Sequence, residues 1–418
     1  MSFSTSLTRS GIAAGTHTHD ATLERQALLF TTIIVAASMF LQRFGLPVGG
    51  KTVNLVGVIG LGTAMIGLSR GVFTFSQARL SAFVVLSMLA LIGLAYHQMS
   101  PALFAASSSL ASVSQFLLLS GFATLSFTVP ISEAAFFRRI NAIFAIIAAA
   151  GIVQFLLQFV GINLFAFSGI LPAALLTEDS YNLQIPIGVG SLLKSNGFFL
   201  LEPSIFSQFM AMAMIVEIVA FRRAAFLGLF AGGLLLSMSG TGWIVLASFI
   251  ATVAFSMGRR GVVISIATFG VLTILVVSAA TLAPDVAAAF SARLDEVFRQ
   301  STSGHMRFVT PFWLLDEVFS RDPSAWLLGI GGGISEQLSL PYEYDVNTPV
   351  KIAIEYGIPS LIAYVVLFAA GQKTSLQRAL LVPGMVLLMF GGGYQQFAPG
   401  LFPILLMMSV GFLRVYGA

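Results

Sequence analysis

Long apolar stretches alternate with short polar segments along almost the whole chain, and twelve such stretches follow residue 26. Most come close to the roughly 20 residues that an α-helix needs to cross about 30 Å of hydrocarbon. The pattern therefore predicts an all-α, polytopic membrane protein with about 12 transmembrane helices. The predicted spans are 27–44, 52–69, 80–97, 109–129, 140–162, 203–221, 224–239, 241–258, 261–282, 350–370, 376–391 and 398–415.

Two polar segments are much longer than the other connections, at about 163–202 and 283–349. Residues 1–26 are mostly polar and rich in Ser and Thr. We expect a flexible cytosolic tail at 1–26 and a single transmembrane domain at 27–418, from which the two long loops emerge. Long loops in compact proteins usually carry function, so the search for a site starts with these two.

The composition narrows the class of protein further. Of the 418 residues, 57% are hydrophobic and only 9% are charged, whereas soluble globular domains carry about 25% charged residues. So few charges could not cover a soluble surface, which excludes a soluble enzyme and a disordered chain. The absence of cysteine excludes disulfides and thiolate metal sites.

Basic residues gather on one side of the predicted spans. With a cytosolic N-terminus, 13 of the 21 Lys and Arg residues fall in the cytosol and 13 of the 17 acidic residues fall outside. The positive-inside rule therefore predicts that both termini are cytosolic and that both long loops are extracytoplasmic. The Arg-Arg pairs act as topology anchors, so the net charge of +4 does not imply a nucleic-acid partner.

Charged residues are almost absent from the centres of the predicted spans. Glu217, near the inner end of its span, is the clearest exception, and we expect it to pair with Arg222 or Arg223. Charges inside hydrocarbon are costly and usually functional. Their scarcity argues against an ion-coupled transporter.

The 283–349 loop is predicted to contain two amphipathic helices. Such helices can lie in the membrane interface or pack on the spans, and both arrangements place Arg293 and Arg307 near headgroup level. Alternatively, Arg307 pairs with Asp316 or Glu317 on its own loop. The first apolar stripe is Val286, Phe290, Leu294 and Phe298, and the second is Phe308, Phe312, Leu315 and Phe319.

The 163–202 segment ends in Glu202, directly before Pro203. Pro suits the first turn of a helix, and a carboxylate is favoured at the positive helix end. Glu202 therefore either stabilises the helix start or serves as a base or hydrogen-bond acceptor at the membrane surface.

Four short motifs follow one another between residues 140 and 370. They are Lys194-x-x-Gly197-Phe198 with Glu202-Pro203; the hairpin Ser237-Met-Ser-Gly-Thr-Gly-Trp243; Ser303-Gly-His-Met-Arg307 with Leu328-Gly-Ile-Gly331; and Val346-Asn347 with Glu355-Tyr-Gly357. Their order and placement resemble the O-antigen ligase/polymerase superfamily, which includes lipopolysaccharide O-antigen ligases and Wzy-type polysaccharide polymerases.

The chain departs from the family pattern at three of these positions. Lys194 stands where relatives usually have Arg, and Gly240 where many have Arg. Val346 stands where ligases have His, so acceptor activation by His at that position does not carry over. The Glu-Pro-Ser form of the first motif resembles exopolysaccharide polymerases.

The resemblance implies a GT-C-like fold and glycosyl transfer at the outer face of a bacterial inner membrane. The donor would be an oligosaccharide on undecaprenyl pyrophosphate, which already carries a good leaving group, so neither a cofactor nor a metal is expected. Membrane lipids, a chain-length regulator and export proteins are the other expected partners. An O-antigen ligase acting on lipid A-core and a lipid-linked glycan flippase or transporter are the alternatives.

Glycosyl transfer of this kind needs cations for the developing pyrophosphate charge and a base for the acceptor hydroxyl. We expect Lys194, Arg293 and Arg307 to bind the pyrophosphate. Asp345 and Glu202 are the candidate catalytic carboxylates, although Asp345 could merely cap the turn before the next span. Further candidate site residues are His305, Asn347 and Glu343. Glu343 and Asp345 could also hold a divalent metal, although the resemblance implies glycosyl transfer without a metal.

Overall fold

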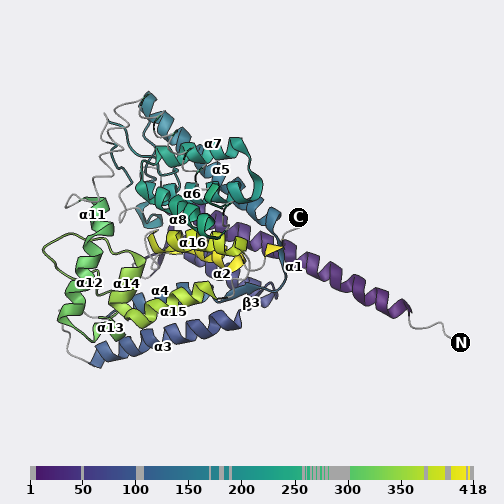
Figure 1. Cartoon of the computed structure of the whole chain (residues 1–418), viewed down its shortest axis with the longest axis horizontal. Helices are drawn as coiled ribbons and strands as arrows, with labels where there is room; N and C mark the ends of the chain where they lie inside the picture. Colours follow the sequence, from purple (N-terminus) through teal and green to yellow (C-terminus); the bar gives the residue numbers. More distant parts are fainter. Residues whose placement is uncertain are drawn as a thin grey trace.

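The computed structural model describes residues 6–48, 51–99, 108–168, 171–177, 183–187, 191–256, 302–370, 375–390, 397–410 and 413–414, with a few positions between 259 and 281. Over these residues the chain is mostly helical, as the hydropathy pattern predicts (Figure 1). The helices are α1 (Ser6–Phe40), α2 (Leu55–Ser69), α3 (Gln77–Met99), α4 (Leu110–Phe122), α5 (Glu133–Leu157), α6 (Pro203–Val216), α7 (Ala224–Leu236), α8 (Gly240–Ser256), α11 (Ser303–Phe308), α12 (Thr310–Arg321), α13 (Ala325–Leu328), α14 (Thr348–Tyr356), α15 (Ile358–Ala369), α16 (Ser375–Phe390) and α17 (Phe397–Val410), with short helical turns η1 (Gln158–Val160), η2 (Ala173–Leu175) and η4 (Glu217–Phe221).

Among the described residues, four helical segments are long and apolar enough to cross a membrane: Asp20–Phe40, Gln77–Met99, Glu133–Val160 and Pro203–Phe221. Shorter apolar helices of 10–17 residues accompany them at Leu55–Ser69, Leu110–Phe122, Ala224–Leu236, Gly240–Ala254, Ile358–Ala369 and Leu380–Phe390. This is a largely helical membrane protein. Of the twelve predicted spans, the one at 261–282 lies mostly outside the described residues.

Three small two-stranded sheets connect helix ends. Strand β1 (Gly45–Val48) pairs antiparallel with β2 (Lys51–Asn54), with Gly45 opposite Asn54. Strand β3 (Phe73–Phe75) pairs antiparallel with β4 (Leu125–Phe127), with Phe73 opposite Phe127. The third pair is parallel and joins β5 (Ile131–Ser132) to β6 (Leu413–Arg414).

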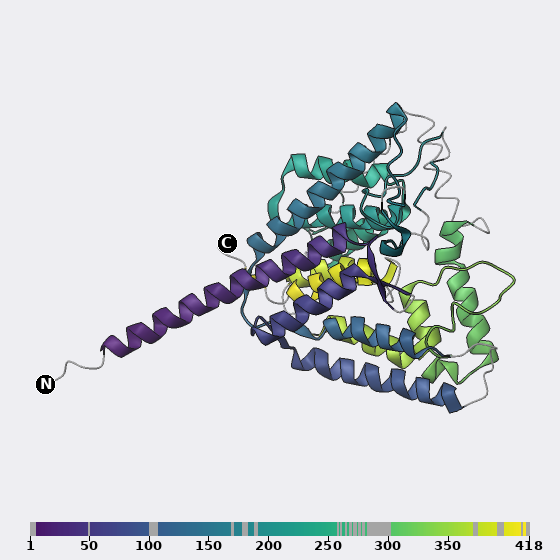
Figure 2. The ribbon, with the colours of Figure 1, turned by 180° about the vertical axis from the view of Figure 1, so that it is seen from behind.

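The beginning of the chain is helical from Ser6 onwards. Helix α1 starts at Ser6 and continues without a break to Phe40, and its first half projects from the body (Figure 2). Residues 23–27 (Leu-Glu-Arg-Gln-Ala) are good helix formers. They adjoin the apolar stretch, and extending an existing helix avoids the cost of nucleation.

The two ends of the helix bundle make separate sets of contacts. At one end, the Glu24 carboxylate accepts a hydrogen bond from the Ser132 backbone (2.9 Å), beside the β5–β6 pair. At the other end, His97 is bonded to Gly329 O (2.9 Å). Figure 1 shows α11–α13 at this second end, opposite the start of α1. The described part of the long loop, residues 302–349, and the beginning of the chain therefore occupy opposite ends of the bundle.

The tenth predicted span, 350–370, is two helices that meet at Gly357. Gly357 has φ +85°, and a Cβ there would lie 2.3 Å from Leu327 O. A Cβ at Gly329 (φ +70°) would lie 2.2 Å from the Glu355 backbone carbon. Only glycine combines this φ with so close an approach. The two glycines let the 325–333 segment pack directly on α14 and α15.

Helix α12 packs on the protein through a face that overlaps the predicted apolar stripe in part. Leu314 and Val318 are fully buried, and they pack with Ile354 of α14. Of the predicted stripe, Phe319 is buried in the same cluster and Leu315 packs against it, whereas Phe312 is 59% exposed. The packing face is therefore shifted from the predicted stripe towards Leu314 and Val318, because a helix apolar on several sides does not reveal which side meets the core. The helix predicted from Pro284 lies outside the described residues.

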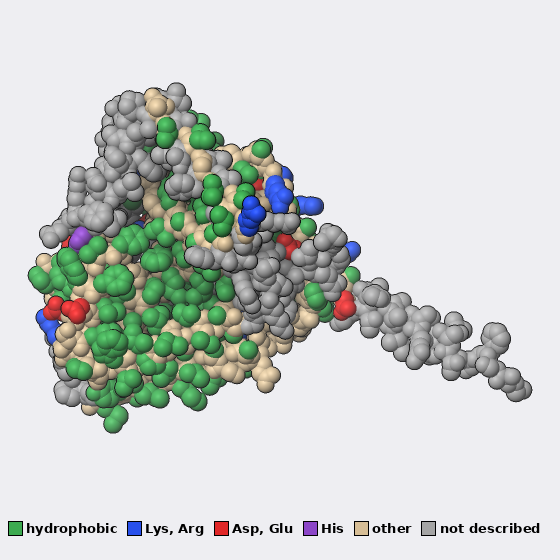
Figure 3. All heavy atoms as spheres, viewed as in Figure 1, with side chains coloured by type: hydrophobic (Ala, Val, Ile, Leu, Met, Phe, Trp, Pro, Cys, Tyr) green, Lys and Arg blue, Asp and Glu red, His purple; other side chains and the backbone are tan. Residues whose placement is uncertain are grey.

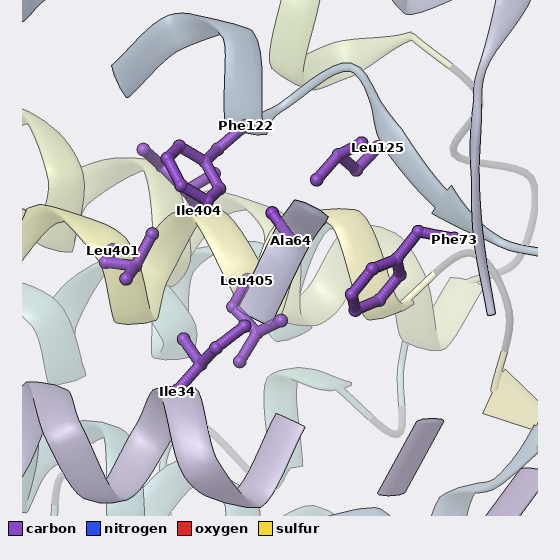
Figure 4. Close-up of a pocket in the computed structure, with 8 residues that line it drawn as sticks. All are labelled: Ile34, Ala64, Phe73, Phe122, Leu125, Leu401, Ile404 and Leu405. Carbon is purple, nitrogen blue, oxygen red and sulfur yellow. The ribbon is translucent and has the colours of Figure 1, made fainter. Parts of the chain in front are cut away.

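A small pocket between α1, α2, α4 and α17 contains hydrocarbon side chains alone (Figure 4). Without a polar group the pocket cannot bind a charged substrate or assist a reaction. It is a packing gap in the bundle. Its lining residues are Ile34, Ala64, Phe73, Phe122, Leu125, Leu401, Ile404 and Leu405.

Candidate functional site

The guanidinium of Arg307 joins two carboxylates that are far apart in the sequence. Its Nε donates to Asp345 Oδ2 at 2.7 Å, and its Nη2 donates to Glu202 Oε2 at 3.3 Å. Arg307 lies on α11, Glu202 directly precedes α6, and Asp345 lies on the loop before α14. The structure therefore brings together three of the residues predicted from the sequence, from both long loops. We call these three residues the Arg307 cluster.

Helix α11 is a single short turn held at both ends by hydroxyl groups. The Thr302 hydroxyl caps its start by accepting from His305 N (3.4 Å). At its end, the Thr310 hydroxyl donates to Met306 O (2.9 Å). Capping by Thr compensates for the unpaired N–H groups of a helix start. These contacts fix the backbone from which the Arg307 side chain extends.

The loop before α14 is attached to α11 through its backbone. Asp345 N donates to Met306 O (3.1 Å), and the Asn347 side chain donates to Arg307 O (3.2 Å). Asn347 also caps α14, since its Oδ1 accepts from Val350 N (3.2 Å). Asn347 therefore performs the capping that was considered for Asp345, and the Asp345 carboxylate points to Arg307 instead.

Glu202 occupies the N-cap position of α6, but its side chain makes no capping hydrogen bond. Its Oε2 accepts from the Ser204 hydroxyl (2.8 Å) as well as from Arg307. The carboxylate is therefore directed at the 302–347 loop and not back onto its own helix.

The Ser-rich hairpin between α7 and α8 packs against the same end of α6. The Thr241 hydroxyl donates to Ser204 O (3.1 Å) and is paired with the Ser207 hydroxyl (3.0 Å). A Cβ on Gly242 would lie 2.5 Å from Ser207 O, so the hairpin can approach this closely only with glycine there. The first two motifs of the family resemblance thus meet beside Glu202.

The third and fourth motifs are also in direct contact. Ile330 N donates to Ile354 O (2.8 Å), and Gly331 N donates to Glu355 O (3.1 Å). The Glu355 carboxylate is buried and accepts from the Ser335 hydroxyl. All four motifs therefore form one connected region around the Arg307 cluster.

The Arg307 cluster carries one positive and two negative charges, so its net charge is negative when both carboxylates are ionised. Burial lowers the pKa of the Arg307 guanidinium, but the charges and hydrogen bonds of Asp345 and Glu202 outweigh this effect and raise it above its usual value. Arg307 thus stays charged, and its first effect is to orient the two carboxylates. The alternative partners on its own loop are not used, because Glu317 pairs with Arg321.

Lys194 lies in a buried polar segment at the end of the 163–202 loop. Its backbone N donates to Ile185 O (2.9 Å). The next residue, Ser195, bonds Gln154 Oε1 (3.0 Å) and Gly151 O (2.9 Å) of α5. Gly197 follows with φ +72°, where a Cβ would lie 2.7 Å from Phe206. The motif is thus folded tightly onto α5 and α6, and pyrophosphate binding by Lys194 stays a prediction.

The other predicted site residues lie apart from the carboxylates. His305 is buried against the ring of Trp313 (5.2 Å between centroids), and its Nδ1 has no hydrogen-bond partner among the described residues. Residues two apart on a helix do not face the same side, so His305 points away from Arg307. Glu343 is exposed, and Arg293 lies outside the described residues. Within the described part of the chain, no three His, Asp or Glu side chains group as metal ligands.

Arg43 is a residue that the sequence analysis did not select. It is fully buried, and its Nε and Nη2 donate to Leu200 O (2.9 and 2.8 Å) while its Nη1 donates to Phe165 O (2.7 Å). Arg43, which follows the end of α1, therefore connects to both ends of the 163–202 loop. Its contact with Leu200 lies two residues before Glu202. Arg43 lies at the outer end of a predicted span, where the positive-inside rule predicts few basic residues. This unusual position was the signal in the sequence that could have identified Arg43.

The Glu217 carboxylate, at the far end of α6, forms the expected ion pair. It accepts from Arg223 Nε (2.8 Å) and Nη2 (2.7 Å) and from Asn141 Nδ2 (2.8 Å). The partner is Arg223, one of the two arginines considered. This buried carboxylate is fully satisfied and makes no case for a second catalytic site.

Comparison of the chain with protein-family models and with curated proteins gives no match. The functional argument therefore rests on the Arg307 cluster and on the motifs that surround it.

Proposed function

We propose that this chain is a polysaccharide polymerase of the bacterial inner membrane, which joins lipid-linked oligosaccharide repeat units into an exopolysaccharide or O-antigen. The observation that carries the proposal is the Arg307 guanidinium holding Glu202 and Asp345 side by side. Two carboxylates fixed by one cation at the loop end of a membrane bundle suit the binding and deprotonation of a sugar hydroxyl.

The proposed reaction is a glycosyl transfer at the outer face of the membrane. The acceptor hydroxyl attacks the anomeric carbon of the donor sugar and forms the new glycosidic bond. The bond from that carbon to the pyrophosphate oxygen breaks, and the pyrophosphate leaves on its polyprenyl chain. The hydroxyl proton passes to Glu202 or Asp345, while Lys194, Arg293 and Arg307 stabilise the leaving group.

The proposal includes a topology of twelve spans with both termini in the cytosol. Contacts at the two bundle ends support an alternating arrangement, because Glu24 meets Ser132 at one end and His97 meets Gly329 at the other. In this topology α11–α13 and the Arg307 cluster face outwards. The polyprenyl chain of the donor remains in the bilayer, and neither a nucleotide sugar nor a metal takes part.

Two alternatives receive less support from the described residues. A ligase that uses His at the position of Val346 is disfavoured, since Val346 packs with the apolar side chains around Leu314 and cannot take a proton. A flippase needs polar groups along a passage between spans. Here Glu202, Arg307 and Asp345 gather at one end of the bundle instead.

The test is incubation of the purified, full-length protein with an undecaprenyl-pyrophosphate-linked repeat unit. A polymerase produces a ladder of products that differ by one repeat unit. Transfer to added lipid A-core without a ladder would support the ligase instead. Movement of the substrate across vesicle membranes without any new glycosidic bond would support the flippase.

A further inference from the structure

Four large side chains on α12 and α13 stay exposed beside the Arg307 cluster. Phe312 is 59% exposed, Trp313 43%, Trp326 51% and Leu327 65%. The stacked rings of Phe319 and Trp326 (4.5 Å between centroids) join the two helices into one unit. We call these four exposed side chains the aromatic face.

The aromatic face is not needed for the packing of α12. The opposite contacts of α12 are made by Leu314 and Val318, which are fully buried in the cluster with α14. Of its charged residues, Glu317 pairs with Arg321. An exposed apolar patch that the protein core does not need indicates a surface that contacts a membrane or another protein.

The position of α13 against α3 indicates that the aromatic face contacts the membrane. A Cβ on Gly93 would lie 2.8 Å from Leu328 O, and His97 is bonded to Gly329 O (2.9 Å). Gly93 lies six residues before the end of α3 at Met99, which corresponds to about 9 Å along a helix. Because α3 is a candidate membrane span, α13 lies alongside the last part of a segment that is apolar and long enough to cross the membrane.

The exposed surface of α3 continues towards the aromatic face. Leu91, Ile92, Tyr96 and Met99 of α3 are 40–87% exposed, as expected for side chains that face lipid. Figure 3 shows hydrophobic side chains spread over the side of the molecule formed by α3 and α15, up to the end that carries α12 and α13. The aromatic face therefore extends a lipid-facing surface.

We propose that the aromatic face of α12 and α13 is inserted into the outer leaflet of the bilayer, at the boundary between headgroups and acyl chains. Trp and other amphipathic rings favour this depth. The ring contact between Trp313 and His305 (5.2 Å) ties the inserted face to α11, which carries Arg307. Insertion thus sets the height of the Arg307 cluster at the level of lipid phosphates. The significance of that height for a lipid-linked donor rests on the proposed polymerase function.

The chain has only three tryptophans, Trp243, Trp313 and Trp326, which makes the test direct. A Trp243→Phe variant reports the two exposed rings. A Trp313→Phe/Trp326→Phe variant, which keeps Trp243, is the matched control. Both are reconstituted at full length in phosphatidylcholine vesicles that contain lipids brominated either near the headgroup or deep in the acyl chain.

We expect bromine near the headgroup to quench the Trp243→Phe variant more strongly than deep bromine does, with aqueous iodide having little effect. Strong iodide quenching without lipid quenching would overturn the proposal and place the face in water. Protection from both quenchers, together with crosslinking between copies, would also overturn it and assign the face to a second copy of the chain. None of these readouts requires catalysis, so failure of the polymerase proposal would leave this result intact.

Discussion

Glu202 and Asp345 share one guanidinium, although 143 residues of chain separate them and they lie on different loops. Neither carboxylate forms the local contact expected of it, since Glu202 does not cap α6 with its side chain and Asn347 caps α14. Their common partner is Arg307. The cluster is therefore a tertiary arrangement, and each of its members can be tested separately.

The first prediction concerns Arg307. Replacement with Ala should lower the turnover of polymer formation roughly ten- to a hundredfold or more, because a charge-assisted contact contributes about 1.5–3 kcal/mol and about 1.4 kcal/mol corresponds to a factor of ten. Product ladders from the purified variant measure the effect. Arg321→Ala is the matched control, since Arg321 pairs with Glu317 away from the cluster. Normal polymer from Arg307→Ala would remove this residue from the site.

The second prediction separates the two carboxylates. Glu202→Gln should abolish chain growth while donor binding remains, because Glu202 is the more buried carboxylate and accepts from both Ser204 and Arg307. Asp345→Asn should have the smaller effect on chain growth. The backbone N of residue 345 would still donate to Met306 O and the Asn347 side chain to Arg307 O, so the loop stays attached to α11. Ladders and donor-binding measurements on both variants give the answer. Full-length polymer from both would mean that neither group is the base.

The third prediction concerns the Glu217–Arg223 pair. Arg223→Ala should destabilise the protein by roughly 1–3 kcal/mol, because it leaves the buried Glu217 carboxylate without its ion-pair partner; the figure is reduced because Arg223 is partly exposed to solvent. Thermal unfolding in detergent measures the loss. Arg222→Asn is the control: its backbone has φ +61°, which Asn tolerates, and its side chain does not bind Glu217. Equal losses in both variants would contradict the assignment.

The fourth prediction concerns two glycines at positive φ. Gly161 has φ +79° and ψ +10°, in the left-handed helical region, where a Cβ costs about 1–2 kcal/mol. Gly329 has φ +70° and ψ −167°, a region that is essentially restricted to glycine. Gly329 also meets the Glu355 backbone at 2.2 Å, whereas no atom lies within 4 Å at Gly161. Gly329→Ala should therefore be clearly less stable than Gly161→Ala in thermal unfolding. A similar loss in the two variants would mean that the 325–333 segment does not pack on α14 as described.

The fifth prediction concerns orientation across the membrane. The chain has no cysteine, so single-cysteine variants need no prior substitution. Glu343→Cys, in the exposed part of the loop before α14, should react with an impermeant maleimide in intact spheroplasts. Arg222→Cys should react only after the membrane is opened. The reverse pattern would place the Arg307 cluster in the cytosol and exclude chemistry on the outer face.

The sequence predicted the helical class, most of the helix positions and three members of the Arg307 cluster, because hydropathy and positions next to spans report these features directly. It did not predict the break at Gly357, which depends on the approach of Leu327 from a separate segment. The packing face of α12 was predicted only in part, since Phe319 and Leu315 of the expected stripe join the core but Leu314 and Val318 were not on it. Their burial depends on contacts with Ile354 of α14, and the periodicity of α12 alone does not contain that information.

The role of Arg43 illustrates a second limit. Three of its hydrogen bonds go to backbone oxygens of Phe165 and Leu200, which any residue supplies, so no side-chain pattern in the sequence identifies these partners. The same holds for the attachment of Asp345 to Met306 through the backbone. Every residue carries a backbone oxygen, so only the folded structure determines which of these oxygens accepts a given hydrogen bond.

The α11–α14 segment has an apolar core of its own, centred on Leu314, Val318 and Ile354, while the residues around Glu202 belong to the large core of the bundle. The boundary between these two cores passes through the Arg307 cluster. Arg307 and Asp345 lie on the smaller body, and Glu202 lies on the larger one. The 3.3 Å contact between Arg307 and Glu202 therefore crosses from one core to the other, whereas the 2.7 Å contact between Arg307 and Asp345 stays within the smaller one. One guanidinium thus connects two separately packed parts of the protein.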